Sequence, residues 1–313
     1  MSALALLADP PAWQTWTGLE HAFMQRALVA ALLVGLTAPL VGVFVVQRGM
    51  ALVGDGIGHV ALAGVASGLL LGWAPVATAL VAACAAALAM EAVRHRRGTG
   101  GDVALAVVFY GGIAGGVVLM GYAPPGGPTL ESYLFGAVTT TSTADLVSFA
   151  VLAGALSLVV LVLRPWLFSV TSDEEHARAT GVPVRLVNGL LGVLVAVTVV
   201  LSMRTVGLLL ISALVVLPVA AAQRVARSSL GVLVLACAGG VLAGSGGVVT
   251  SYWTGTPTGG TVVLLSLALL AVVVVAGAAH GRLAGRRPRR REQGPAAAAP
   301  RPDALSVRPG AGG

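Results

Sequence analysis

The sequence predicts an all-α polytopic membrane protein with about nine transmembrane helices (eight to nine). Three observations predict this fold. The 313 residues are 57% hydrophobic and 10% charged, with a mean hydropathy of +0.93, whereas about 25% of the residues of a soluble domain are charged. Apolar stretches of the length that crosses a bilayer recur along the chain. Turns rich in glycine, proline or arginine separate these stretches.

The apolar segments make up a predicted transmembrane domain over residues 27–280. One segment contains Asp55 and His59 and ends at Gly72, and the others are 27–46, 76–93, 103–122, 146–163, 186–202, 206–222, 230–250 and 261–279. Residues 1–26 mix prolines and tryptophans with apolar residues, which suits a segment lying at the membrane interface. Residues 281–313 are rich in arginine, proline and alanine and are predicted to form a disordered cytoplasmic tail. Contact with anionic lipid suits this tail better than nucleic acid.

The distribution of arginine predicts the orientation. The sequence contains no lysine, so its net charge of +7 depends on arginine alone. If the first span runs from outside to inside, nearly all arginine-containing connections fall on the cytoplasmic side, as the positive-inside rule requires. The N terminus is then outside and the C terminus is cytoplasmic, which needs an odd number of spans and favours nine.

Asp55 and His59 are the residues most suited to chemistry. They are four residues apart, so on a helix they share one face. An ionised side chain at the bilayer centre costs at least ~2.5 kcal/mol. One interpretation is a pair that satisfies itself near the start of a helix. The other is a cation site, because carboxylate and imidazole suit Zn²⁺ or Mn²⁺.

Two ligands are too few for tetrahedral zinc. Two copies of the chain meeting about a two-fold axis at this helix would supply two aspartates and two histidines. A glycine stripe on the same helix would then allow the close approach. Its members are Gly56, Gly64, Gly68 and Gly72.

The longest polar connection lies between Arg164 and Val187. Asp173 to Ala179 can form a short helix there, with Ser172 or Asp173 as its cap and Gly181 and Pro183 at its end. The acidic run is interpreted as a solvated surface rather than a set of metal ligands. A short, capped helix in this loop would also give another protein a rigid surface to dock on.

Several chemistries are excluded by missing motifs. No GxxxxGK[ST] sequence is present, so the chain cannot bind ATP through a P-loop, and no HExxH or GxSxG sequence supports a hydrolase. Cys84 and Cys237 lie in apolar runs and are interpreted as small packing residues. The chain is therefore not expected to be an enzyme or to bind a cofactor of its own.

Four segments resemble the membrane-spanning subunits of ABC importers for zinc and manganese. They are the block FVVQRGMALVGDGIGHVALAGVA (Phe44 to Ala66), the element YLFG (Tyr133 to Gly136), the loop Ser172 to Val184, and the block Ser202 to Ala222. In order and spacing, the resemblance covers roughly Phe23 to Ala279. Its first block is the most specific.

The resemblance implies a homodimer in the bacterial plasma membrane, with a pair of cytoplasmic ATP-binding subunits and an extracytoplasmic metal-binding protein. It implies that Asp55 and His59 line the path of the transported ion. Zinc is the preferred ion because two aspartates and two histidines suit it at low coordination, and manganese, which accepts the same ligands, comes next. The loop is implied to be the helix that couples to the ATPase. Its residues are Ser172, Asp173, Glu174, Glu175, Ala179 and Gly181.

Two other classes stay open. A proton-coupled secondary metal transporter would use Asp55 and His59 as a relay and would need no ATPase. A membrane scaffold without transport activity would leave the pair without a purpose and ranks last.

Overall fold

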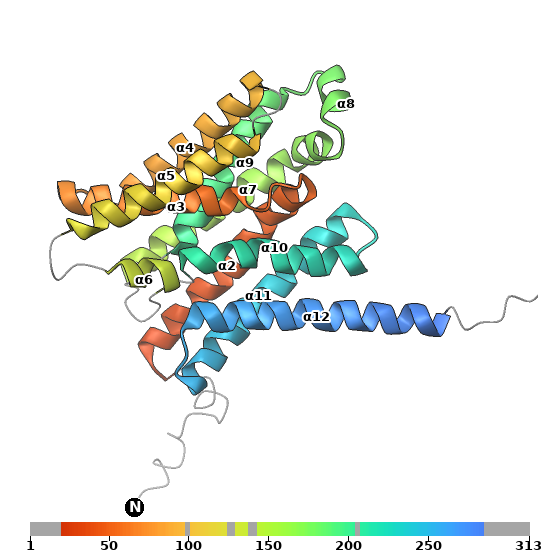
Figure 1. Cartoon of the computed structure of the whole chain (residues 1–313). Helices are drawn as coiled ribbons and strands as arrows, with labels where there is room; N and C mark the ends of the chain where they lie inside the picture. The colour runs from red at the N-terminus through yellow and green to blue at the C-terminus, as the bar shows by residue number, and fades with distance from the viewer. Residues whose placement is uncertain (1–19, 98–100, 124–128, 137–142, 204–206, 285–313) are drawn as a thin grey trace, which may run out of the picture. The chain divides into compact units, whose positions relative to one another are not determined.

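The computed structural model describes residues 20–97, 101–123, 129–136, 143–203 and 207–284, which contain helices and no strand (Figure 1). Long helices are α2 (Ala22–Gln47), α3 (Val53–Leu71), α4 (Pro75–Arg97), α5 (Gly101–Gly121), α7 (Thr143–Ser172), α9 (Val184–Met203), α10 (Leu208–Val225), α11 (Ser229–Thr254) and α12 (Thr258–Ala284). Short helices are α6 (Leu130–Phe135) and α8 (Glu174–Ala179). The all-α prediction is confirmed.

The long helices match the predicted spans one for one. Seven of those described are long and apolar enough to cross a membrane, and α5 and α10 add shorter apolar stretches over Leu105–Gly121 and Ile211–Val225. The interfacial segment predicted for residues 1–26 lies outside the described residues up to residue 19, and α2 begins at Ala22. The predicted disordered tail lies outside them from residue 285 onward. The orientation of the termini stays a prediction.

Residues 1–277 form one compact unit, and residues 278–313 form a second. Within the first unit, α2, α3 and α9 are the most enclosed of the described spans. Helix α2 packs against α7, α10 and α11, and α3 packs against α4, α5, α9 and α10. Val43, Phe44 and Ile57 are fully buried between these helices.

Helix α7 is longer than predicted. The prediction ended this span at Leu163, before Arg164 and Pro165, but the helix continues through Pro165 to Ser172. Packing favours the extra turns, because Leu167 is fully buried and the Phe168 ring lies 4.8 Å from the Phe44 ring on α2. Buried apolar area here outweighs the one backbone hydrogen bond that a proline removes.

The role predicted for the glycine stripe is wrong. A Cβ atom on Gly64 would lie 2.8 Å from Ala79 Cα of α4, and one on Gly56 would lie 3.0 Å from Leu105 of α5. Gly68 likewise faces Thr78 of α4, while Gly72 ends the helix with φ +70°. The missing side chains therefore let α3 approach helices of its own chain, and they do not form a surface for a second copy.

Candidate metal-binding site

Helix α3 places Asp55 and His59 on one face, as the sequence predicts. The helix starts at Val53, after a turn that follows Arg48, so Asp55 lies in its first turn and His59 one turn later. A carboxylate in the first turn interacts favourably with the helix dipole. His59 is only 8% exposed, whereas Asp55 is half-buried. The pair thus combines a buried imidazole with a carboxylate that keeps part of its surface open.

Asp55 is bonded by a side chain from another helix. The Ser212 hydroxyl of α10 donates to Asp55 Oδ1, across a sequence separation of 157 residues. The self-satisfied pair predicted as one alternative is therefore not the arrangement seen, because Ser212 rather than His59 bonds the carboxylate. Hydrogen bonds of this kind orient carboxylates that bind metal ions. Sequence reasoning missed Ser212, although a serine in the apolar run LLLISALVVL was a signal.

The His59 ring is fixed by an aromatic contact. Its centroid lies 4.9 Å from that of Phe109 on α5, with the rings at 82° in an edge-to-face arrangement. Close backbone packing supports this contact, because a Cβ atom on Gly112 of α5 would lie 2.8 Å from the carbonyl carbon of His59. Helix α5 therefore sets where the imidazole lies.

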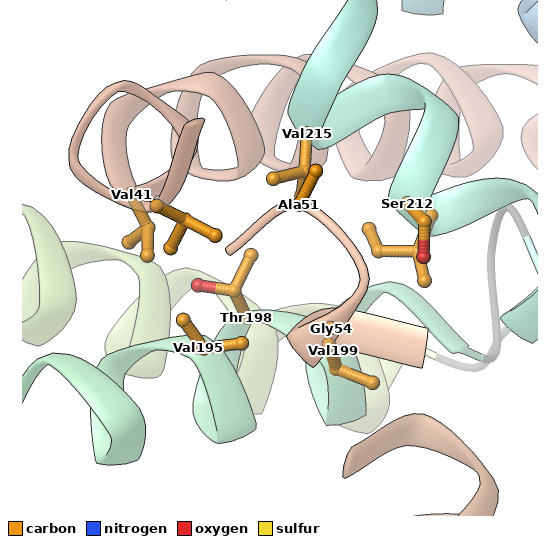
Figure 2. Close-up of a pocket in the computed structure, with 10 residues that line it drawn as sticks. Val41, Ala51, Gly54, Val195, Thr198, Val199, Ser212 and Val215 are labelled. Atoms are coloured by element: carbon orange, nitrogen blue, oxygen red, sulfur yellow. The ribbon is translucent and has the colours of Figure 1, made fainter. Parts of the chain in front are cut away.

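A cavity of about 10 Å³ lies between α2, α3, α9 and α10, and Gly54 and Ser212 are among the residues that line it (Figure 2). This volume holds about one water molecule. Most of its lining is aliphatic, and its polar side chains are Thr198 and Ser212. Thr198 donates its hydroxyl to the carbonyl of Leu194 in its own helix, at 2.7 Å.

The ligand set within one chain is small. No group of three or more histidine, cysteine, aspartate or glutamate residues capable of holding a metal ion occurs among the residues that the structure describes. The two cysteines, Cys84 and Cys237, are free thiols on α4 and α11. Asp55 and His59 are therefore the two candidate ligands, and the Ser212 hydroxyl bonds the first of them.

The predicted helix in the polar loop is confirmed. Asp173 caps α8, because its Oδ1 accepts from the His176 backbone N–H at 2.9 Å. Ala177 is fully buried and anchors the helix, while Glu175 and Ala179 are exposed. Glu174 forms an exposed ion pair with Arg178 at 3.1 Å. Ser172 ends α7, and Gly181 turns the chain toward α9 with φ +86°.

These features define a class of protein. A multi-pass helical bundle with a carboxylate and an imidazole inside it, and an exposed helix fixed between two spans, is suited to moving a cation across a membrane. The chain belongs to the ABC 3 transport family, which its residues 20–277 match. It is therefore a polytopic ABC-type permease of a bacterial membrane.

Metal-transport membrane proteins and a solved structure are similar to this chain over most of its length. The manganese transport system membrane protein MntC of Halalkalibacterium halodurans is 33% identical over 255 residues, which are 81% of this chain and 87% of that protein. The high-affinity zinc uptake system membrane protein ZnuB of Haemophilus influenzae is 33% identical over 250 residues, 78% and 95% of the two chains. The solved structure of PsaBC from Streptococcus pneumoniae in complex with Fab matches 82% of this chain and 92% of that one, at 29% identity and a TM-score of 0.75.

Proposed function

We propose that this chain is the permease subunit of an ATP-driven importer that moves a divalent transition-metal ion into the cell. The observation that supports this proposal is the Asp55 and His59 pair on the enclosed helix α3, with Ser212 bonded to the carboxylate. An intramembrane ionisable pair is costly and marks an ion path. Relatives whose names refer to manganese and zinc transport add support.

Zinc is the proposed substrate, with manganese next. Imidazole is a ligand that zinc favours, and carboxylate oxygen serves both ions. Cu(I) is disfavoured because it would need thiolate or thioether ligands. The ion is cargo in this proposal, and the chain binds no cofactor of its own.

The energy source in this proposal is a separate pair of ATP-binding subunits in the cytoplasm. The chain has no P-loop sequence, so ATP hydrolysis is assigned to those subunits. Helix α8 is proposed as their docking point, because it is capped, exposed and anchored by a buried alanine. An extracytoplasmic metal-binding protein is proposed to deliver the ion.

A second copy of the chain is proposed to complete the transport unit. Asp55 and His59 leave a tetrahedral zinc ion two ligands short. The same pair from a second copy would supply two more, and the open part of the Asp55 carboxylate is the proposed point of approach. The glycine stripe plays no part in this arrangement, since it packs within one chain.

The test is ion-resolved uptake by the complex reconstituted in proteoliposomes with its ATPase subunits. We expect uptake of radioactive zinc that needs ATP, continues after a protonophore collapses the proton gradient, and saturates at a lower concentration than manganese uptake. Uptake that follows the proton gradient without ATP would instead indicate the proton-coupled carrier, with Asp55 and His59 as its relay.

A further inference from the structure

Arg48 connects the turn before α3 to the helices on both sides of α8. Its Nε donates to the Thr171 hydroxyl at 3.3 Å, and its Nη1 donates to Asn188 Oδ1 at 2.6 Å. Thr171 lies at the end of α7, directly before the α8 loop, and Asn188 lies in the first turns of α9, directly after it. One side chain therefore holds both ends of the segment that contains α8.

The contact between Arg48 and Asn188 is partly buried. Asn188 is only 7% exposed, and the Nη2 atom of Arg48 is buried without a hydrogen-bond partner in the part of the chain that the structure describes. Burial lowers the pKa of the Arg48 guanidinium, and the nearby charge of Glu174 on α8 opposes this shift. A buried cation without its partners is costly, so the guanidinium is expected to stay with the α7, α8 and α9 segment when that segment moves.

The opposite side of the same turn is held by α4. Arg94 Nη1 donates to Met50 Sδ at 2.6 Å, and Arg94 also lies 3.7 Å from Glu91 Oε2. Helix α3 begins directly after this turn, at Val53, and Asp55 lies in its first turn. The turn therefore joins the start of α3 to the segment around α8.

We propose that Arg48, through Asn188, is a positioning residue that transmits movement of α8 to Asp55 and His59. This inference rests on the proposed function of α8 as the docking point for the ATPase. Arg48 does not touch the ion. Its side chain sets the position of α3 relative to α8. Loss of the Arg48–Asn188 contact therefore uncouples ATP hydrolysis from ion transport.

The test measures ions transported per ATP hydrolysed by the reconstituted complex with its ATPase subunits, using radioactive zinc. Arg48→Lys keeps the charge but cannot form the forked contact, and Asn188→Leu removes the acceptor at similar size. For both variants we expect the ratio to fall about tenfold, within the usual range of coupling between sites. The KM for zinc should change less than about twofold, since the metal ligands are intact.

Two further variants distinguish this positioning role from a non-specific effect of substitution on folding or transport. Asn188→Asp keeps an acceptor oxygen for Arg48 and is expected to keep the wild-type ratio. Arg227→Lys makes the same substitution at an exposed arginine after α10, is the matched control for Arg48→Lys, and is expected to keep the wild-type ratio. A wild-type ratio in both Arg48→Lys and Asn188→Leu would overturn the inference, as would an equal fall in Asn188→Asp. If instead the wild-type complex moves no metal ion, the proposed function itself fails.

Discussion

The Asp55 carboxylate is held by the Ser212 hydroxyl of α10, and in the proposed function this bond orients the carboxylate toward the ion. Ser212 fixes one carboxylate oxygen, and the aromatic edge of Phe109 fixes the His59 ring. Both proposed ligands thus have a fixed orientation without an ion. A ligand that is already oriented loses less conformational entropy on binding.

Ser212→Ala tests this orientation. We expect the KM for metal uptake to rise about tenfold, because outer-shell hydrogen bonds contribute at least that much to metal affinity. Ser266→Ala is the matched control, since Ser266 is also buried but bonds the Val262 carbonyl of its own helix at 2.9 Å. Equal KM values for the two variants would contradict the role given to Ser212.

The sequence predicts Asp55 and His59 but not Ser212, and the reason is distance along the chain. Two residues that are four positions apart on a helix lie on the same face because of helix geometry alone. A contact between residues 157 positions apart depends on how α3 and α10 pack, and no local pattern encodes that packing. The contacts of Arg48 are not predicted by the sequence either, because its partners Thr171 and Asn188 lie on helices far along the chain.

At the scale of the element, glycines set how closely α3 approaches its neighbours. The spacing of the glycines shows that they share one face of α3, but it does not show which helix packs against that face. In the structure, α4 and α5 pack there. The end of α7 was missed for a related reason. Proline is expected to end a helix, and only the packing of Leu167 and Phe168 shows why this helix continues.

Gly112→Ala tests the contact between α5 and α3. A Cβ atom there would lie 2.6 Å from the Val60 backbone nitrogen, so we expect the free energy of unfolding to fall by about 1–3 kcal/mol. The neighbouring Gly111→Ala is the control, because nothing lies within 4 Å of its added Cβ. Thermal unfolding of the purified protein measures both. A Gly112 variant as stable as the Gly111 variant would contradict this packing.

Asp173→Ala tests the cap of α8. Loss of the bond to the His176 N–H at 2.9 Å should destabilise the helix by about 0.5–2 kcal/mol, so we expect weaker co-purification with the ATPase and less stimulated hydrolysis. Asp173→Ser retains a capping oxygen and should retain most of both. Similar losses in the two variants would show that the charge, rather than the cap, is what the ATPase recognises.

At the scale of the whole molecule, the sequence predicted the helical class and the set of spans well. A transmembrane helix can be recognised from the length and apolar composition of its own segment, so its prediction does not depend on contacts with other helices. The orientation rests on arginine placement alone and has its own test. Because the natural chain contains no lysine, a single introduced lysine gives a unique side-chain amine.

Arg227→Lys provides that amine in the connection between α10 and α11. We expect a membrane-impermeant amine reagent to modify residue 227 in inverted vesicles but not in intact spheroplasts, as peptide mass spectrometry would show. Modification in intact spheroplasts alone would reverse the predicted orientation.

In the proposed function, the ion passes Asp55 and His59. The most direct measurement is ATP-dependent zinc uptake by the reconstituted complex with Asp55→Asn or His59→Gln, each checked for normal assembly with the ATPase subunits. We expect uptake to fall to the level seen without ATP while assembly is unchanged. Uptake at the wild-type rate in either variant would contradict it.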